Sequence, residues 1–138
     1  MRIFILEDNE YKLNDIKKVL QDAFPTAEID SCGFFNRGVG MLLKGDYDIA
    51  VLDNQLPRFP DSKNHWVGDA ASHVLDYVYM EEVGVKCVIC SAYDDKTKEA
   101  SFESLMREYD VSCIGYVRYQ NNSSDWAKKL VEIIKKAA

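Results

Sequence analysis

Five short strand-like segments alternate with five segments of helical periodicity, and this alternation constrains the fold more than any other feature of the sequence. Four of them are apolar runs, at residues 2–6, 49–52, 85–90 and 113–117, and residues 27–32 alternate between polar and apolar as a half-exposed strand does. Runs of this length, rich in β-branched and other apolar side chains, are typical of strands. Strands that alternate with helices pair in parallel through right-handed crossovers. We therefore predict an α/β fold, a doubly wound five-stranded parallel sheet with helices on both faces.

The helical segments each follow one strand-like segment. In the first, apolar residues recur at helical spacing at Leu13, Ile16, Leu20 and Phe24. This spacing places Lys12, together with Lys17 and Lys18, on the outer face of that helix. Further helices are predicted over residues 35–44, 68–83 and 95–109. A last helix is expected to begin at Asn122 or Ser123, since both residue types cap helices well.

The composition suits one globular domain over residues 1–138. Hydrophobic residues make up 47% and charged residues 29% of the chain, values that allow a buried core. The net charge of −6 argues against binding nucleic acid or an anionic membrane through bulk charge. No apolar run approaches the roughly 20 residues of a membrane span, and no signal peptide precedes the first strand. We expect a cytoplasmic protein.

The four cysteines fit the same compartment. Cys87 and Cys90 form a C-x-x-C spacing, but both fall inside a predicted strand, as does Cys113. Positions i and i+3 of a strand point to opposite faces, so this pair cannot close on one metal or on each other. We therefore interpret these residues and Cys32 as small apolar core residues in a reducing environment.

Polar residues stand where three of the predicted strands end. Glu7 and Asp8 follow the first strand, Asp53 follows the third, and Ser91 follows the fourth. In an open α/β sheet the working residues lie just beyond the carboxyl ends of the strands. If the first and third strands are neighbours, the three acids converge at one point.

Three converging carboxylates repel one another, so either one keeps a proton at raised pKa or a cation binds between them. Oxygen ligands with room for water favour Mg²⁺ or Mn²⁺ over zinc. The acids at this edge therefore predict a divalent cation site. Taken alone, Asp53 could be no more than a solvated acid at the end of a strand. The neighbouring acids and Ser91 argue against that alternative.

With these motifs in order, the chain resembles a response-regulator receiver domain of two-component signalling, chemotaxis-regulator-like, over almost its whole length. The matching pieces are residues 5–9 (ILEDN), residues 47–57 (YDIAVLDNQLP), Ser91 with Ala92, and residues 115–117 (GYV). The resemblance implies a flavodoxin-like (βα)5 fold with strand order 2-1-3-4-5. Each piece is weak alone, and their common order and spacing carry the resemblance.

The resemblance also implies roles for individual residues. Asp53 would accept a phosphoryl group from a histidine kinase or a phosphotransfer protein in a phosphorelay, giving an aspartyl phosphate. Mg²⁺ would be held by Glu7, Asp8, Asp53 and the backbone carbonyl of Gln55. Ser91 would supply the hydroxyl that turns toward the phosphoryl oxygens, and Tyr116 would be the aromatic switch. The implied chemistry is self-phosphorylation and dephosphorylation rather than that of a metabolic enzyme.

The sequence departs from the receiver pattern at the fifth strand. Receivers carry a lysine three positions after the switch aromatic, and here that position holds Tyr119, followed by Gln120. Arg118 stands one residue early, so on a regular strand it would face the other way. A bulge could bring Arg118 in as the replacement, or another cation could substitute.

A second departure is an insertion at residues 58–67, between Pro57 and Gly68. Its polar, proline-containing sequence predicts a loop. Because long surface insertions cost little, a tolerated loop is one interpretation. A lid or a partner-binding element beside the acid cluster is the other.

Three functions remain open from the sequence. The first is a stand-alone receiver that signals by protein–protein contact, since the sequence contains no output domain, with a downstream protein partner or a homodimer through the face between the fourth and fifth helices. The second is a phosphorylation-independent pseudo-receiver that acts as an interaction module. The third is a small phosphatase of the same fold with an Asp nucleophile, disfavoured because no second acid stands two residues past Asp53.

Overall fold

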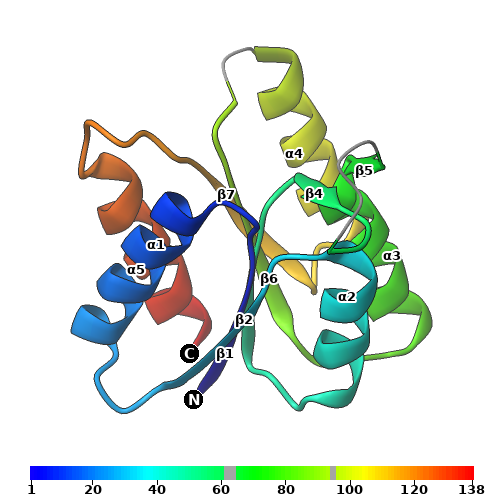
Figure 1. Cartoon of the computed structure of the whole chain (residues 1–138), viewed down its shortest axis with the longest axis horizontal. Coiled ribbons are helices and arrows are strands. Elements are labelled where there is room, and N and C mark those ends of the chain that lie inside the picture. Colours follow the sequence, from blue (N-terminus) through cyan, green and yellow to red (C-terminus); the bar gives the residue numbers. More distant parts are fainter. Residues whose placement is uncertain (61–64, 94–95) are drawn as a thin grey trace.

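A five-stranded parallel sheet forms the centre of the structure, a computed structural model that describes residues 1–60, 65–93 and 96–138. The sheet consists of β1 (Arg2–Leu6), β2 (Glu28–Cys32), β3 (Ile49–Leu52), β6 (Lys86–Ser91) and β7 (Cys113–Arg118). Their order is β2-β1-β3-β6-β7, and all neighbours run in parallel (Figure 1). Counted among themselves, these strands have the predicted order 2-1-3-4-5.

Helices cover both faces of the sheet, as the alternation predicted. The described helices are α1 (Glu10–Ala23), α2 (Phe35–Lys44), α3 (Ala70–Met80), α4 (Lys96–Glu108) and α5 (Asp125–Ala137). α1 and α5 lie on one face, and α2, α3 and α4 lie on the other (Figure 1). The start predicted for the fourth helix, Asp95, lies outside the described residues. The last helix begins at Asp125 with Ser124 as its N-cap, slightly later than predicted.

Each face of the sheet has its own apolar core. Beneath α1 and α5 the buried side chains include Ile3, Ile5, Ile16, Val51, Trp126 and Leu130. Beneath the other three helices they include Phe4, Leu6, Leu52, Leu75, Val78 and Phe102. Cys87 belongs to the second core and Cys90 to the first, so the two thiols lie on opposite faces, as predicted. All four cysteines are free and buried.

The register of the central strands brings two predicted site segments side by side. Leu6 of β1 pairs with Leu52 of β3, so Glu7 and Asp53 are the next residues on neighbouring strands. The Asp53 amide donates a hydrogen bond to the Leu6 carbonyl at 2.9 Å. The parallel arrangement therefore delivers both acids to the same edge, at the end of the sheet opposite the two chain termini (Figure 1).

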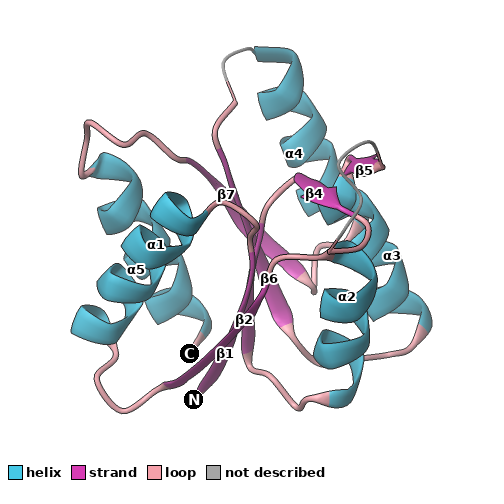
Figure 2. Ribbon diagram, in the orientation of Figure 1, coloured by secondary structure: helices cyan, strands magenta, loops and turns pink. Residues whose placement is uncertain are grey.

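A hairpin that the sequence did not predict flanks the insertion. Residues 58–60 and 65 form no helix or strand, as predicted, whereas Trp66 and Val67 belong to the second strand of the hairpin. β4 (Gln55–Pro57) pairs with β5 (Trp66–Gly68) as two antiparallel strands, which Figure 2 shows above α2 and α3. Residues 61–64, between the two strands, lie outside the described residues. Leu56 and Val67 are buried in the core against α3, and this burial orders a segment whose polar composition suggested no element.

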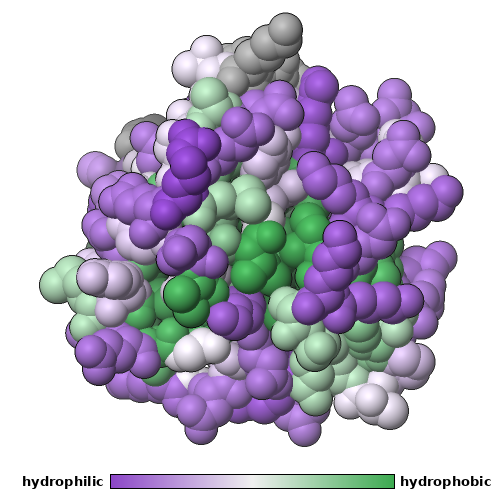
Figure 3. Space-filling view, turned by 180° about the vertical axis from the view of Figure 1, so that it is seen from behind, coloured by the Kyte–Doolittle hydropathy of each residue, from purple (hydrophilic) through white to green (hydrophobic). Residues whose placement is uncertain are grey.

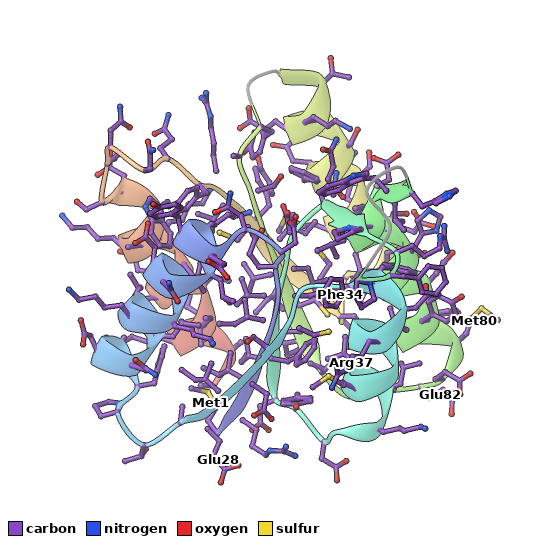
Figure 4. The ribbon with its side chains drawn as sticks, viewed as in Figure 1. Met1, Glu28, Phe34, Arg37, Met80 and Glu82 are labelled. Carbon is purple, nitrogen blue, oxygen red and sulfur yellow. The ribbon has the colours of Figure 1, made fainter. Side chains whose placement is uncertain are left out.

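α2 and α3 both begin at the end of the sheet where the strands finish. Phe34 caps the start of α2 and Arg37 lies one turn further along, whereas Met80 and Glu82 project outward at the far end of α3 (Figure 4). Gly38 lets α2 approach β1 closely, because a Cβ atom at this position would clash with the Leu6 side chain. The glycine that weakens the helix by propensity is thus required by its packing.

The outer surface is mostly hydrophilic. Seen from behind, apolar side chains gather in the centre of the face and hydrophilic ones surround them (Figure 3). Within the described part of the chain, no helix is both long enough and apolar enough to cross a bilayer.

Candidate functional site

A cavity of about 660 Å³ opens at the carboxyl ends of the strands. Six of the polar residues in its lining are Glu7, Asp8, Lys12, Asp53, Ser91 and Tyr119. Five of these six come from segments just after a strand or from Ser91, the last residue of β6. The cavity therefore occupies the place where open α/β sheets bind their ligands.

Three carboxylates converge at the base of this cavity. Ligand oxygens of Glu7, Asp8 and Asp53 all lie within 4.8 Å of one another. Glu7 is only 2% exposed, and the other two acids are half-buried. The convergence expected from the strand ends is therefore present.

The convergence raises the pKa of two of these acids. Burial, reinforced by the charge of Asp53, raises the pKa of Glu7 to about 7, even though the neighbouring Lys12 acts in the opposite direction. Burial and the same Asp53 charge also raise the pKa of Asp8. A carboxyl group whose charge is disfavoured in this way gains when a cation comes close.

Lys12 supplies a cation to this cluster, and its position contradicts the prediction that it lies on the outer face of the first helix. The residue is 6% exposed. Its Nζ atom lies 2.6 Å from Glu7 Oε1 and 3.1 Å from Asp53 Oδ1, and it donates to the Cys90 carbonyl at 2.6 Å. Burial disfavours the ammonium charge, but Asp53 and Glu7 outweigh burial and raise the pKa of Lys12.

The start of α1 fixes the backbone of Lys12. Asn9 is the N-cap, and its side-chain oxygen accepts a hydrogen bond from the Lys12 amide at 3.0 Å. Lys12 thus begins a buried stripe that continues with Ile16 and Leu20 at spacings of four. That stripe was the available signal for its burial, because a lysine four residues before a buried isoleucine shares its face.

The loop that follows Asp53 is held by the next residue. The Asn54 amide donates to Asp53 Oδ1 at 2.8 Å, and its side-chain oxygen accepts from the Ala71 amide at 3.3 Å. The Asn54 carbonyl also accepts from the Ala70 amide at 3.0 Å. Asn54 is buried and joins the end of β3 to the start of α3, a function that sequence reasoning did not assign to it.

The end of β7 presents Tyr119 to the cavity in place of a lysine. The Tyr119 hydroxyl donates to Asp15 of α1, and its ring lies 4.9 Å from the Trp126 ring. The Lys12 ammonium lies 5.7 Å from the centre of the same ring. An aromatic side chain thus packs beside the cation that α1 provides.

Arg118 points to another neighbour. It is exposed, its Cα pairs in register with Ser91, and its guanidinium lies 5.9 Å from the Tyr93 ring. Among the described residues, Arg118 is not part of the cavity lining. Among the described residues, the ion pair of Asp53 is formed by Lys12, and the replacement role of Arg118 stays a prediction.

The remaining predicted residues stand at or beside the cavity. Ser91 and Gln55 both line it, the first at the end of β6 and the second at the start of β4. Tyr116 lies outside the lining, with its hydroxyl donating to Glu103 of α4 at 2.9 Å and its ring 5.8 Å from that of Phe102. The Tyr116 hydroxyl is therefore directed toward the outer surface of α4.

The donor set fits a hard divalent cation. All three clustered ligands are carboxylate oxygens, the kind that Mg²⁺ and Mn²⁺ prefer. The buried Glu7 Oε1 atom lies 2.6 Å from the Lys12 ammonium. A carboxylate oxygen in this position is suited to a cationic partner, and Lys12 is one such partner in the structure.

Solved structures with the same fold are response-regulator proteins. A DNA-binding response regulator of the LuxR family from Staphylococcus aureus superposes with a TM-score of 0.72 at 17% identity, covering 99% of this chain and 97% of that one. A CheY-like receiver domain protein from Methanospirillum hungatei gives 0.68 at 21%, covering 98% and 90%. The Thermotoga maritima response regulator TrrA, solved in complex with Mg²⁺ and BeF, gives 0.67 at 21%, covering 99% and 98%.

These similarities establish that the chain has the fold of response-regulator receiver domains, the CheY-like arrangement of five parallel strands and five helices. No protein-family model matches the sequence, and no curated protein matches it in a sequence comparison. The likeness is therefore one of structure at low sequence identity.

Proposed function

We propose that this chain is a response-regulator receiver that accepts a phosphoryl group on Asp53 from a histidine kinase or a phosphotransfer protein. The observation that carries the proposal is the placement of Asp53 in an open cavity, between two further acids and a buried lysine. Charge neutralisation around a positioned carboxylate is most of what phosphoryl transfer requires of a protein. The receiver fold supports the same conclusion.

In the proposed reaction an oxygen of Asp53 attacks the phosphorus of a phosphohistidine. The new P–O bond forms as the P–N bond breaks, and the departing imidazole nitrogen keeps the electron pair of that bond. The Asn54 amide holds Asp53 Oδ1 at 2.8 Å, which orients the carboxylate. Hydrolysis of the acyl phosphate by water then returns Asp53 to its carboxylate form.

Glu7, Asp8, Asp53 and the backbone carbonyl of Gln55 are the groups that we propose hold Mg²⁺ or Mn²⁺. Such an ion, when bound, neutralises charge on the phosphoryl oxygens. Within the chain, Glu7 contributes a buried carboxylate, and ligand oxygens of Asp8 and Asp53 lie within 4.8 Å of it.

The signal is proposed to leave the site through Ser91 and Tyr116. Ser91 lines the cavity at the end of β6, so its hydroxyl can turn toward a phosphoryl group on Asp53. Tyr116 lies on the next strand and contacts α4 through Glu103. A change at Ser91 would alter the packing of Tyr116 and the surface of α4, β7 and α5, where a downstream protein or a second copy of the chain would bind.

The test is Mg²⁺-dependent labelling of the purified protein with acetyl phosphate, measured as a shift in intact mass. We expect labelled wild type and an unlabelled Asp53→Asn variant, because the amide is not a nucleophile. Asp48→Asn is the matched control, since Asp48 is an exposed acid that pairs with the Arg2 amide at the far end of the same strand. Labelling that persists in Asp53→Asn would reject the proposed acceptor.

A phosphorylation-independent pseudo-receiver is a second candidate, and Lys12 is the observation that favours it. The Lys12 ammonium already pairs with Glu7 and Asp53, so part of the negative charge of the cluster is neutralised without a metal. In that case wild type would show neither labelling nor any spectroscopic response to Mg²⁺. Labelling of wild type, or a spectroscopic response to Mg²⁺, would exclude the pseudo-receiver.

We also propose that residues 1–138 act as one cytoplasmic receiver unit. The support is the set of four free, buried cysteines, which fits a reducing compartment.

A further inference from the structure

Lys12 has a burial and a set of contacts that the proposed function does not by itself explain. It lies in the first turn of α1, yet its ammonium reaches the carboxyl ends of β1, β3 and β6. A buried lysine costs desolvation energy, which two carboxylates and one carbonyl offset here. One of these contacts is to Asp53, the residue that we propose reacts.

The contacts give the ammonium a defined place beside the reacting group. Lys12 Nζ lies 3.1 Å from Asp53 Oδ1 and donates a hydrogen bond to the Cys90 carbonyl at 2.6 Å. Cys90 is the residue that precedes Ser91. Lys98 also lines the cavity, but it pairs with Asp69 at 3.4 Å. Of the two lysines that line the cavity among the described residues, Lys12 is therefore the one in contact with Asp53.

Tyr119 supports the ammonium from the other side. Its ring lies 5.7 Å from Lys12 Nζ and packs against Trp126, and its hydroxyl bonds to Asp15 on the same helix as Lys12. The Tyr119 amide donates to the Ser91 carbonyl at 3.0 Å. Tyr119 thus ties the end of β7 to α1 and fills the space beside the lysine side chain.

We propose that Lys12 is the catalytic cation of this site, delivered by α1, and that Tyr119 is the residue that positions it. This inference rests on the proposed function. The ammonium contacts Asp53 before transfer and pairs with the phosphoryl oxygens afterwards, where two or more negative charges attract it more strongly than Glu7 does. In the receiver pattern a lysine on the fifth strand supplies the cation. Here Lys12 of α1 would supply it, and Tyr119 stands at the position of that lysine.

The test measures the affinity for beryllofluoride, a mimic of the phosphoryl group, at saturating Mg²⁺. Fluorescence of the native tryptophans reports binding, because Trp66 lines the cavity. We expect Lys12→Gln to weaken beryllofluoride binding at least about tenfold, as expected for loss of a charge-assisted contact. Lys18→Gln removes an exposed lysine from the same helix and should change the affinity less than about twofold.

A transplanted lysine separates a catalytic role from a structural one. The double variant Lys12→Gln/Tyr119→Lys returns an ammonium to the cavity from β7, and we expect it to recover most of the lost affinity. A role limited to neutralising Glu7 within the fold would give no weakening in a folded Lys12→Gln variant, and that result would overturn the inference.

If Lys12→Gln does not fold, the wild-type protein still decides the matter. The ¹⁵N resonance of the Lys12 ammonium, identified by its loss in Lys12→Arg, should shift when beryllofluoride is added, whereas that of Lys18 should not. An unchanged Lys12 resonance in the bound protein would overturn the inference. Wild type that fails to bind beryllofluoride would overturn both the proposed function and the inference, whereas binding that is insensitive to Lys12 overturns the inference alone.

Discussion

The two walls of the cavity are built from different interactions. The wall next to α1 consists of Glu7, Asp8 and Lys12 and is held by short, buried ion pairs. The wall next to α4 includes Tyr93, whose ring contacts that of Tyr116. The Tyr116 hydroxyl donates an exposed hydrogen bond to Glu103. Buried charges are costly to separate, whereas exposed hydrogen bonds break at little cost.

The difference indicates a division of labour. We expect the α1 wall to keep its geometry and carry the chemistry, and the α4 wall to change and carry the signal. Substitutions on the first wall should therefore alter stability and ligand affinity strongly, and those on the second should alter them weakly. Four measurements test this contrast, in decreasing order of expected effect.

The largest effect is expected from Lys12→Met. Removing the ammonium leaves Glu7 and Asp53 without their cation, which should lower the free energy of unfolding by about 3 kcal/mol. Urea denaturation at pH 7 in the presence of a chelator measures the change, and Lys18→Met on the exposed face of α1 is the control. A loss below about 0.5 kcal/mol would show that the α1 wall is not held by this ion pair.

Glu7 should make stability depend on pH. Its pKa of about 7 in the folded chain exceeds the ordinary value of 4.5, so between these values the folded state binds more protons than the unfolded state. The free energy of unfolding should therefore fall by about 2 kcal/mol as the pH rises from 5 to 7 without metal. The stabilisation that comes from protonated Glu7 is complete below pH 4.5 and is lost above pH 7.

Glu7→Gln removes the titrating group and tests that assignment. Denaturation at several pH values should give a flatter profile for this variant than for wild type. A decline as steep as that of wild type would assign the pH dependence to other groups.

Mg²⁺ should bind more tightly when Lys12 is neutral. A divalent ion and the ammonium share the oxygens of Glu7 and Asp53, so they repel each other at short range. We expect Lys12→Gln to increase Mg²⁺ affinity about tenfold, measured by tryptophan fluorescence or calorimetry. Unchanged affinity would mean that the ion and the ammonium do not share ligands.

The smallest effect is expected from Tyr116→Phe on the α4 wall. The substitution removes the hydroxyl that bonds to Glu103 and leaves the ring packed on Phe102. Because this bond is exposed, unfolding free energy should change by less than about 1 kcal/mol and beryllofluoride affinity by less than about twofold. A tenfold loss of beryllofluoride affinity would show that Tyr116 affects ligand binding as strongly as the α1 wall, and would contradict the proposed difference between the two walls.

Periodicity predicted the strands, the helices and the parallel sheet, and the resemblance to receiver domains supplied the strand order. Residues 49–52 are apolar without interruption, as a strand buried on both faces requires, and the helical spacing in α5 was equally regular. The β4–β5 hairpin escaped prediction because each strand has only three residues, too few for alternation to emerge. Its order comes from the burial of Leu56 and Val67 against the rest of the molecule.

The acid cluster was also predictable, since strand ends in a parallel sheet share one edge. Lys12 was not, because charged side chains on a helix ordinarily face water and the apolar set chosen for α1 began at Leu13. The structure instead shows Lys12, Ile16 and Leu20 as the buried positions. The long lysine stem follows the apolar stripe while its ammonium reaches the acids, so charge and hydrophobic pattern gave conflicting signals.

Asn54 has a consequence for how this protein could change over evolution or be engineered. By bonding to Ala70 and Ala71, it closes the base of the segment that contains the β4–β5 hairpin. Sequence added between the two strands would lengthen a closed loop, and the entropic cost of that lengthening grows only slowly. The closed segment is thus a suitable place to introduce a reporter or a recognition peptide.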